Sequence, residues 1–191
     1  SRNGIHSDGE SSTYWEFVRI LKEMGEDRPP LVTLENVEGL LTSGDGADLE
    51  AALRALNELG YSVDVLIIDA SHFVPHSRVR LFVVAQQREG QDGIQLEQHL
   101  SRSGSARPEK VRDFIRTYPD IDWRLRSLPE LPQTDLKVKD IVDEEENDWW
   151  DDDRAEYLFS QMYKRHEDKV EEMMQQDEWQ YGTVFRRTRK R

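Results

Sequence analysis

The first 87 residues alternate between helical and strand-like spacings of apolar side chains. Apolar residues recur at helical spacing over 13–24 and over 49–59, and both segments are predicted to be amphipathic helices. Gly60 follows the second helix at the position where a helix commonly ends. Short runs rich in aliphatic and β-branched residues predict three strands, at 31–36, 61–70 and 79–86.

These elements predict an α/β fold. The second and third strands are nearly continuous apolar runs at their centres, which is typical of strands covered on both faces. The loop between them, residues 71–78, is too short for a crossover helix, so we expect the two strands to be antiparallel. The order of elements corresponds to one half of a doubly wound domain that ends in a strand pair.

The pattern changes after residue 87. Residues 88–150 mix Gly, Ser, Pro and charge, and only 108–118 has helical spacing, with Pro108 suited to a first turn. Residues 151–176 are predicted to form one long helix with a narrow apolar stripe. The stripe consists of Leu158, Met162, Tyr163, His166, Val170 and Met173. We therefore divide the chain into an α/β part at 1–87, an irregular acidic linker at 88–150, and a long helix with a basic end at 151–191.

Charge is distributed unevenly along the 191 residues. The net charge is −13, but residues 140–180 alone carry 16 acidic and 4 basic side chains, and the last eleven residues carry five basic and no acidic ones. The total therefore does not exclude a nucleic-acid partner, although DNA would not lie on the acidic segment. The sequence has no apolar run near the ~18 residues that a membrane span needs, which favours an intracellular protein and no membrane partner.

Composition also limits the chemistry. The chain has no cysteine, which excludes disulfides, thiolate zinc sites and a cysteine nucleophile within it. His72 and His76 are four residues apart, but Pro75 places them in a loop and no third ligand is evident, so we expect no metal site.

Polar residues gather at two strand ends. Glu35 and Asn36 close the first predicted strand, and Arg78 and Arg80 open the third. Ligands bind at the carboxyl ends of strands in open α/β sheets, and an antiparallel third strand would begin at that same edge. Glu35 and the arginines can then form a structural salt bridge, or they can bracket a polar ring between them.

These residues resemble the motifs of the DNA (cytosine-5-)-methyltransferase family. The family's Glu-Asn-Val motif matches Glu35, Asn36 and Val37, and its Gln-x-Arg-x-Arg motif matches His76, Arg78 and Arg80, with histidine in place of glutamine. The match covers residues 1–86, and residues 181–189 resemble the entry to the target-recognition region of some members. The resemblance implies a partial S-adenosylmethionine-dependent, Rossmann-like sheet with a C-terminal helical appendage.

The resemblance also implies roles for the motif residues. Glu35 would recognise N3 and the exocyclic amine of a flipped cytosine and activate the ring, and Arg80 would hold O2. Asn36 would fix the turn that aims Glu35, and Arg78 would order the loop or contact phosphate. Val37 and His76 are supporting positions of the same two motifs. The basic tail, with Arg186, Arg187 and Arg189, suits phosphate contacts with double-stranded DNA.

The family's cysteine nucleophile has no counterpart in this chain, and most of the S-adenosylmethionine site would lie outside it. We therefore expect a fragment of a bacterial or phage methyltransferase, cytoplasmic and nucleoid-associated, that is inactive alone. It would come from a restriction–modification or solitary methylation system. A strand edge left open by missing strands could drive self-association. Two alternatives remain: a non-catalytic, methyltransferase-like DNA-binding or interaction module, and an acidic adaptor whose resemblance is accidental.

Overall fold

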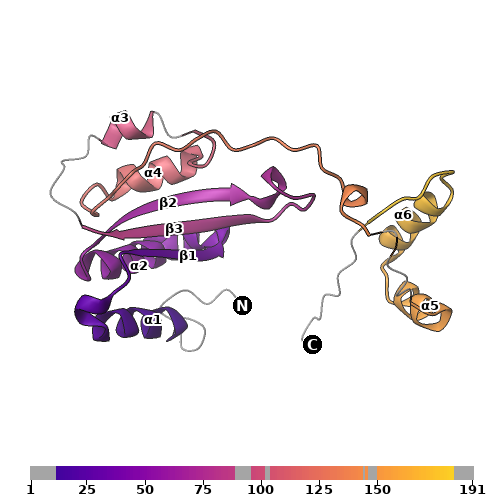
Figure 1. The fold of residues 1–191 in the computed structure, drawn as a ribbon, viewed down its shortest axis with the longest axis horizontal. Coiled ribbons are helices and arrows are strands. Elements are labelled where there is room, and N and C mark those ends of the chain that lie inside the picture. Colours follow the sequence, from indigo (N-terminus) through magenta and orange to yellow (C-terminus); the bar gives the residue numbers. More distant parts are fainter. Residues whose placement is uncertain (1–11, 89–95, 102–103, 144, 146–149, 183–191) are drawn as a thin grey trace. The chain divides into compact units, whose positions relative to one another are not determined.

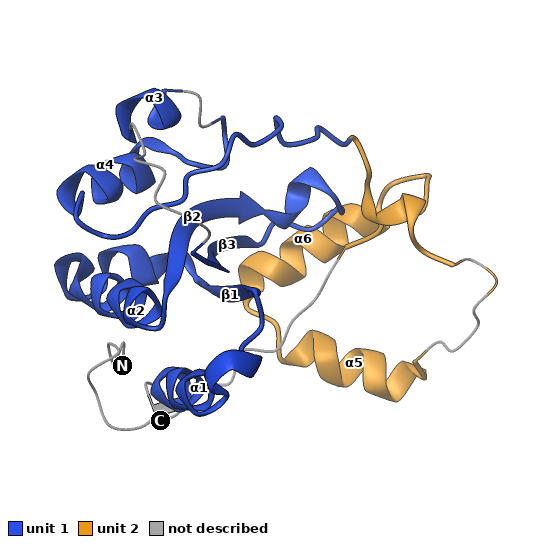
Figure 2. Ribbon diagram, turned by 60° about the vertical axis from the view of Figure 1, so that its left-hand side comes forward, with its two compact units in different colours: residues 1–134 blue, residues 135–191 orange. Residues whose placement is uncertain are grey.

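The computed structural model describes residues 12–88, 96–101, 104–143, 145 and 150–182 (Figure 1). The chain divides into two compact units, Ser1–Thr134 and Asp135–Arg191, which are coloured separately in Figure 2. Within the described ranges, no helix is both long and apolar enough to cross a bilayer.

The first unit is built on three strands, β1 (Leu31–Val37), β2 (Tyr61–Asp69) and β3 (Val79–Gln87). The strand order is β1-β3-β2, and β3 is antiparallel to both neighbours (Figure 1). The α/β class and the antiparallel pairing of the last two strands are therefore confirmed. The central place of β3 is not evident from the sequence, because apolar runs do not specify which strands pair.

Two helices of the first unit lie where the periodicity predicts them. α1 spans Ser12–Glu23 and α2 spans Ala47–Glu58, and the hydroxyl of Tyr14 in α1 donates a 2.6 Å hydrogen bond to the carbonyl of Ala52 in α2. Gly60 takes a φ of +85°, a conformation that glycine adopts without strain, and the chain then turns from α2 into β2.

The main core lies between α2, α4 (Glu109–Thr117) and one face of the sheet. Figure 2 shows both helices on the same side of the strands. Leu49, Leu53 and Leu56 of α2 are fully buried, as are Val63 and Val65 of β2 and Leu81 and Ala85 of β3. Alternate residues of β1 and β3 point to the opposite face, which is covered over β2 and more open over β1. Burial on both faces is thus confirmed for β2, whereas β3 is buried on one face and half-buried on the other.

Residues 104–126 pack within the first unit, whereas the sequence pattern predicts that they belong to a linker. The Val63 N–H donates to the Asp122 carbonyl (2.9 Å), and the Ile67 N–H donates to the Ala106 carbonyl (2.8 Å), so this segment covers the outer edge of β2. α4 agrees with the predicted helix at 108–118, and the short helix α3 spans Leu96–Leu100. The edge pairing was missed because isolated Trp123 and Leu125 have no strand-like neighbours in the sequence.

The second unit contains two helices, α5 (Asp152–Ser160) and α6 (Lys164–Met174), rather than the one long helix that the sequence predicts. The prediction of one helix is wrong because Tyr163 is extended (φ −73°, ψ 145°), which ends the helical path between α5 and α6. Neither helix has a buried residue, and Tyr163 remains 69% exposed. The narrow apolar stripe therefore does not build a core within this unit.

Candidate functional site

The end of β1 presents a carboxylate that is only half-buried. The side chain of Glu35 is 48% exposed. It shares an outward face of β1 with Leu31 and Val37, which are exposed, whereas Val32 points to the buried core. Asn36 bonds locally: its Oδ1 accepts the N–H of Val37 at 2.8 Å, which holds the backbone just beyond Glu35.

The sheet register brings Arg80 to this carboxylate. Val37 lies opposite Arg80 and Glu35 lies opposite Phe82, so Glu35 and Arg80 are diagonal neighbours on one face of the sheet. The Nε of Arg80 lies 2.7 Å from Oε1 of Glu35, and Nη2 of Arg78 lies 3.7 Å from the same oxygen. Glu35, Arg78 and Arg80 therefore form one cluster at one edge of the sheet.

The two arginines of this cluster differ in exposure and in their contacts. Arg80 is 21% exposed, and its Nη1 also donates to its neighbour's carbonyl, that of Val79, at 2.8 Å. The side chain of Arg78 is 53% exposed, and the one contact that the structure shows for its guanidinium among the described residues is the longer one with Glu35. Because both contacts that the structure shows for Glu35 end on Oε1, Oε2 has no protein partner among the described residues. The cluster can therefore accept a donor on one side and offer guanidinium N–H groups beside it.

His76, the residue in the glutamine position of the motif, is exposed and makes no contact with Glu35 among the described residues. Its backbone N–H donates to the Val74 carbonyl at 2.7 Å, so it belongs to the loop between β2 and β3. His72 of the same loop contacts the Pro132 carbonyl through Nδ1 at 2.8 Å. Within the described residues no group of three or more His, Cys, Asp or Glu side chains is arranged to hold a metal ion.

Asp69 lies next to the cluster of Glu35 and the two arginines and is not among the site residues that the sequence predicts. It ends β2, and its carboxylate accepts hydrogen bonds from the N–H groups of Ser71 (3.0 Å) and Arg78 (2.7 Å) and from the hydroxyl of Ser77 (2.9 Å). The bond from the Ser71 N–H is the main cause that lowers the pKa of Asp69 to about 2. The signal in the sequence is an Asp at a strand end followed by a loop, which is typical of an Asx turn.

A second missed pair lies on the same sheet face. Asp64 of β2 and Arg107 are both buried, with Nε of Arg107 donating to Oδ1 of Asp64 at 3.0 Å and Nη2 bonded to Oδ2. The Nη2 group also donates to the Arg126 carbonyl (2.9 Å), and the Arg126 N–H donates to Asp64 (3.3 Å). Burial raises the pKa of Asp64, and the guanidinium of Arg107 opposes that shift.

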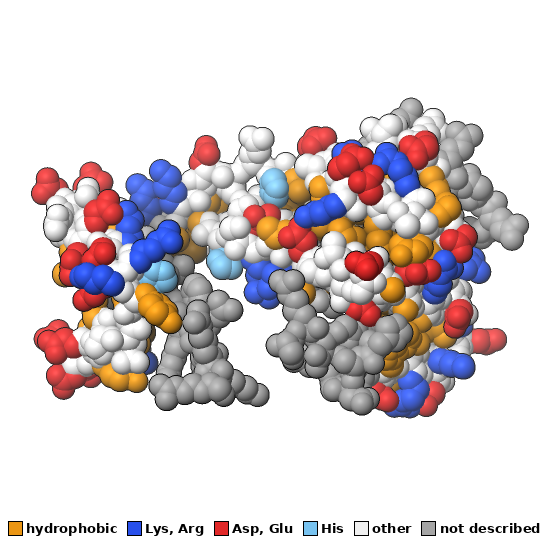
Figure 3. All heavy atoms as spheres, turned by 180° about the vertical axis from the view of Figure 1, so that it is seen from behind, with side chains coloured by type: hydrophobic (Ala, Val, Ile, Leu, Met, Phe, Trp, Pro, Cys, Tyr) orange, Lys and Arg blue, Asp and Glu red, His pale blue; other side chains and the backbone are white. Residues whose placement is uncertain are grey.

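The charged surface shows no separation by sign on the face drawn in Figure 3, where acidic and basic side chains of the described residues are interspersed. The three arginines assigned to phosphate contacts, Arg186, Arg187 and Arg189, lie outside the described residues. Their assignment stays a prediction.

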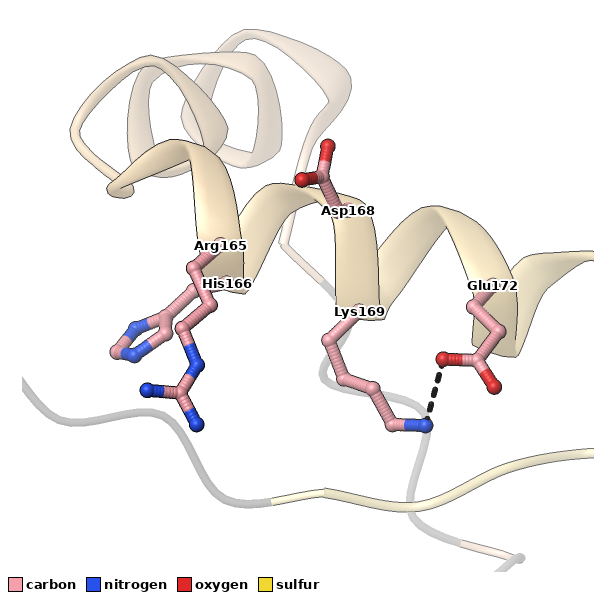
Figure 4. A pocket seen from close by; sticks show the side chains of 5 residues that line it. All are labelled: Arg165, His166, Asp168, Lys169 and Glu172. Atoms are coloured by element: carbon pink, nitrogen blue, oxygen red, sulfur yellow. Dashed lines mark hydrogen bonds and ion pairs between the residues drawn. The ribbon is translucent and has the colours of Figure 1, made fainter.

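A hollow of about 620 Å³ lies beside α6 in the second unit. It is lined by Arg165, His166, Asp168, Lys169 and Glu172, which all come from this one helix (Figure 4). Lys169 is paired with Glu172 at 2.7 Å, and Asp168 is paired with Lys164 at 3.0 Å. Because one exposed helix supplies all five residues and two of them already form an ion pair with each other, we do not assign a site there.

Three comparisons relate the chain to known proteins. A family model described as C-5 cytosine-specific DNA methylase matches residues 1–191. The type II methyltransferase M.MspI of Moraxella sp is 35% identical over 85 residues, which cover 44% of this chain and 20% of that protein. The orphan methyltransferase M.SPBetaI of Bacillus phage SPbeta is 37% identical over 60 residues, which cover 31% of this chain and 14% of that protein. The chain thus spans a fifth or less of the length of these two curated relatives.

Among solved structures, the Dnmt2 methyltransferase of S. pombe aligns with 51% of this chain and 31% of its own, at 23% identity and a TM-score of 0.38. The family assignment depends on the sequence matches and not on this structural likeness.

Proposed function

Because the chain belongs to the C-5 cytosine-specific DNA methylase family, we propose that it forms part of an enzyme that methylates C5 of a cytosine flipped out of duplex DNA. The observation that supports this most directly is the cluster at the sheet edge, where Oε1 of Glu35 lies 2.7 Å from Nε of Arg80 while Glu35 stays 48% exposed. The carboxylate and the guanidinium of such a pair can give up part of their contact with each other and form hydrogen bonds with a polar ring instead.

The proposed roles follow from the donors and acceptors of cytosine. The carboxyl group of Glu35 would meet N3 and the exocyclic amine, because it can donate to the first when protonated and accept from the second. A proton held at N3 makes the ring accept a nucleophile at C6 more readily. Arg80 would donate to O2 and stabilise charge that develops there. Arg78, more exposed, would order the loop or contact a phosphate, and Asn36 would hold the backbone that aims Glu35.

The roles proposed for Glu35, Arg80, Arg78 and Asn36 concern the DNA and not the methyl donor. Enzymes of this family generally take their methyl group from S-adenosylmethionine. The strand-end cluster is exposed, and the hollow beside α6 is lined by residues of a single exposed helix, so among the described residues neither encloses the adenosine part of that cofactor. We therefore derive no step through the cofactor and assign no residue of this chain to it.

The chain has no cysteine to attack C6 and spans a fifth or less of its two relatives' lengths. We therefore expect the 191-residue chain alone to transfer no methyl group. Methyl transfer by the purified chain with labelled cofactor and duplex DNA would contradict this expectation. If the full gene encodes no cysteine nucleophile, the non-catalytic DNA-binding or interaction module becomes the better assignment.

We further propose double-stranded DNA as the partner and the cytoplasm of a bacterium, in association with the nucleoid, as the location. M.MspI is named a type II methyltransferase and M.SPBetaI an orphan methyltransferase, which supports a restriction–modification or solitary methylation system. Self-association would use β1, whose outer edge pairs with no other strand in the described part of the chain. Sedimentation of the chain over a concentration series measures this directly.

The base-recognition role can be tested on the chain itself. We expect deoxycytidine monophosphate, added to the labelled chain, to shift the NMR signal of the Arg80 Nε–H, and thymidine monophosphate to shift it much less. Thymidine monophosphate is the matched control because it has the same phosphate and sugar, but its ring presents a donor at N3 and no exocyclic amine. Equal shifts with both nucleotides would mean that the chain binds only the phosphate and the sugar, which would contradict the role of Glu35 in recognising the base.

A further inference from the structure

We infer that Asp69 is a positioning residue for the Glu35, Arg78 and Arg80 cluster: it closes the loop between β2 and β3 and thereby fixes where the two arginines enter the sheet. This inference rests on the proposed function of the cluster, and it adds a residue that neither motif contains.

The loop closes on the side chain of Asp69. Oδ1 accepts the N–H of Ser71 at 3.0 Å, two residues on, and the N–H of Arg78 at 2.7 Å, nine residues on. Oδ2 accepts the hydroxyl of Ser77 at 2.9 Å. One carboxylate thus holds both the first turn of the loop and its last two residues.

The backbone continues this closure into the sheet. The N–H of Ala70 donates to the Arg78 carbonyl at 3.2 Å, and Asp69 lies opposite Val79, the first residue of β3. Arg80 comes next, opposite Ile68, and reaches Glu35 from there. Because β3 begins at Val79, directly after the residue whose N–H Asp69 holds, a looser loop would displace Arg78 most and Arg80 to a smaller extent.

The contacts assign Asp69 to positioning and not to proton transfer. Its oxygens are occupied by three protein donors, and its lowered pKa keeps it ionised at every pH at which methyl transfer would be assayed. A carboxylate that stays ionised has no proton to give, and hydrogen bonds that stabilise its charged form make it a weak base.

The loop between the clamped ends also carries exposed apolar residues. Phe73 is 53% exposed and Val74 is 45% exposed, and among the described residues neither belongs to the hydrophobic core or packs against it. The contact of His72 with the Pro132 carbonyl at 2.8 Å is a second anchor, on the far side of the loop. Of these two side-chain anchors, Asp69 is the one that contacts Ser77 and Arg78, which lead into β3.

The first experiment compares D69A, D69N and the unchanged 191-residue chain by NMR. Asparagine keeps an oxygen for the N–H groups of Ser71 and Arg78, so D69N should preserve the exchange rate of the Arg78 amide within about twofold, whereas D69A should accelerate it about tenfold or more. D69A should also shift the Arg80 Nε–H signal. An unchanged Arg78 amide and Arg80 signal in D69A would overturn the inference.

The control is D151A. Asp151 caps α5 by accepting the Arg154 N–H at 2.8 Å, which is the same kind of bond in the other unit. D151A should accelerate exchange at Arg154 and leave Arg78 unchanged.

If the circular dichroism of D69A shows that this variant does not fold, S77A is used to test the inference instead, because S77A removes only the bond to Oδ2 of Asp69. A twofold to threefold acceleration at Arg78, on the order expected for one exposed hydrogen bond, supports the inference, and an unchanged rate overturns it.

The second experiment uses a protein that carries this chain within a complete catalytic domain. D69A should lower kcat about tenfold or more with KM for DNA within about threefold, since misplaced groups cost rate more than binding, and D69N should restore kcat. If D69N is as slow as D69A, Asp69 acts through its charge and the inference fails. If E35Q is fully active, the proposed function fails whatever D69A does. If E35Q is slow and D69A is not, only the inference fails.

Discussion

The sheet carries two carboxylate–guanidinium pairs on the same face, and their surroundings differ. Asp64 of β2 and Glu35 of β1 lie on opposite sides of β3, with Asp64 opposite Val84 and Glu35 opposite Phe82. The Asp64–Arg107 pair is sealed, with side-chain exposures of 4% and 0%. In the Glu35–Arg80 pair, 48% of the Glu35 side chain is open to solvent.

Under the proposed function, one carboxylate–guanidinium pair belongs to the packed interior and the other serves a ligand, and what covers each pair makes the difference. The buried pair has its oxygens engaged by Arg107 and by the Arg126 backbone, so a ligand has nothing to gain there. In the exposed pair, the structure shows contacts to one oxygen only. Removing one partner of a buried pair leaves an uncompensated charge in the interior, whereas an exposed pair contributes little to stability.

The largest effect is expected from R107A. It leaves the Asp64 carboxylate buried without its partner, which should cost about 3–5 kcal/mol of unfolding free energy, measured by urea denaturation. The matched control replaces both partners with apolar residues, D64L together with R107M, and should recover most of that loss. A loss below about 1 kcal/mol in R107A would mean that the pair is not sealed as described.

The next effect concerns Glu35. In a protein with a complete catalytic domain, E35Q should lower kcat about 10²–10³-fold while duplex binding changes much less, because the amide cannot give a proton to N3. The readout is single-turnover methyl transfer beside a binding titration. Equal losses of rate and of binding would assign Glu35 to holding DNA and not to activating the ring.

Asp69 is an intermediate case, exposed yet held by three donors, and it predicts a pH dependence. Its pKa is lowered from 3.8 to about 2 in the folded chain, so the unfolded chain binds more protons in that interval. Its contribution to stability should be present above about pH 4 and lost as the pH falls toward about 2. Urea midpoints of the unchanged chain and D69N should therefore converge on acidification. Midpoints that differ by a constant amount would contradict the lowered pKa.

The smallest effect is expected from E35A on stability. Because Glu35 is half-exposed, removal of its side chain should change the unfolding free energy by no more than about 1 kcal/mol. A loss comparable to that of R107A would make the Glu35–Arg80 pair structural, as in the salt-bridge alternative that the sequence left open.

The sequence predicted the parts of the molecule that depend on local pattern. Residues 31–36, 61–70 and 79–86 became strands, and the polar ends of two of them met at one edge because an antiparallel third strand must begin where the first ends. The helix at 108–118 was likewise visible from its spacing.

The remaining features do not follow from the periodicity of apolar residues. Arg107 reaches Asp64 across 43 positions, and no local pattern marks a buried arginine in a charged stretch. The extended Tyr163 breaks a helix whose apolar spacing continues through it. Asp69 was the nearest miss, since an Asp at a strand end is a recognisable turn former, but its bond to Arg78 requires the closed loop.

The middle position of β3 has a consequence for synthesis of the chain. β1 and β2 are each hydrogen-bonded to β3, the last of the three to emerge from the ribosome. β1 and β2 therefore cannot pair within this sheet until β3 has also emerged. Their apolar residues stay accessible to chaperones during that interval.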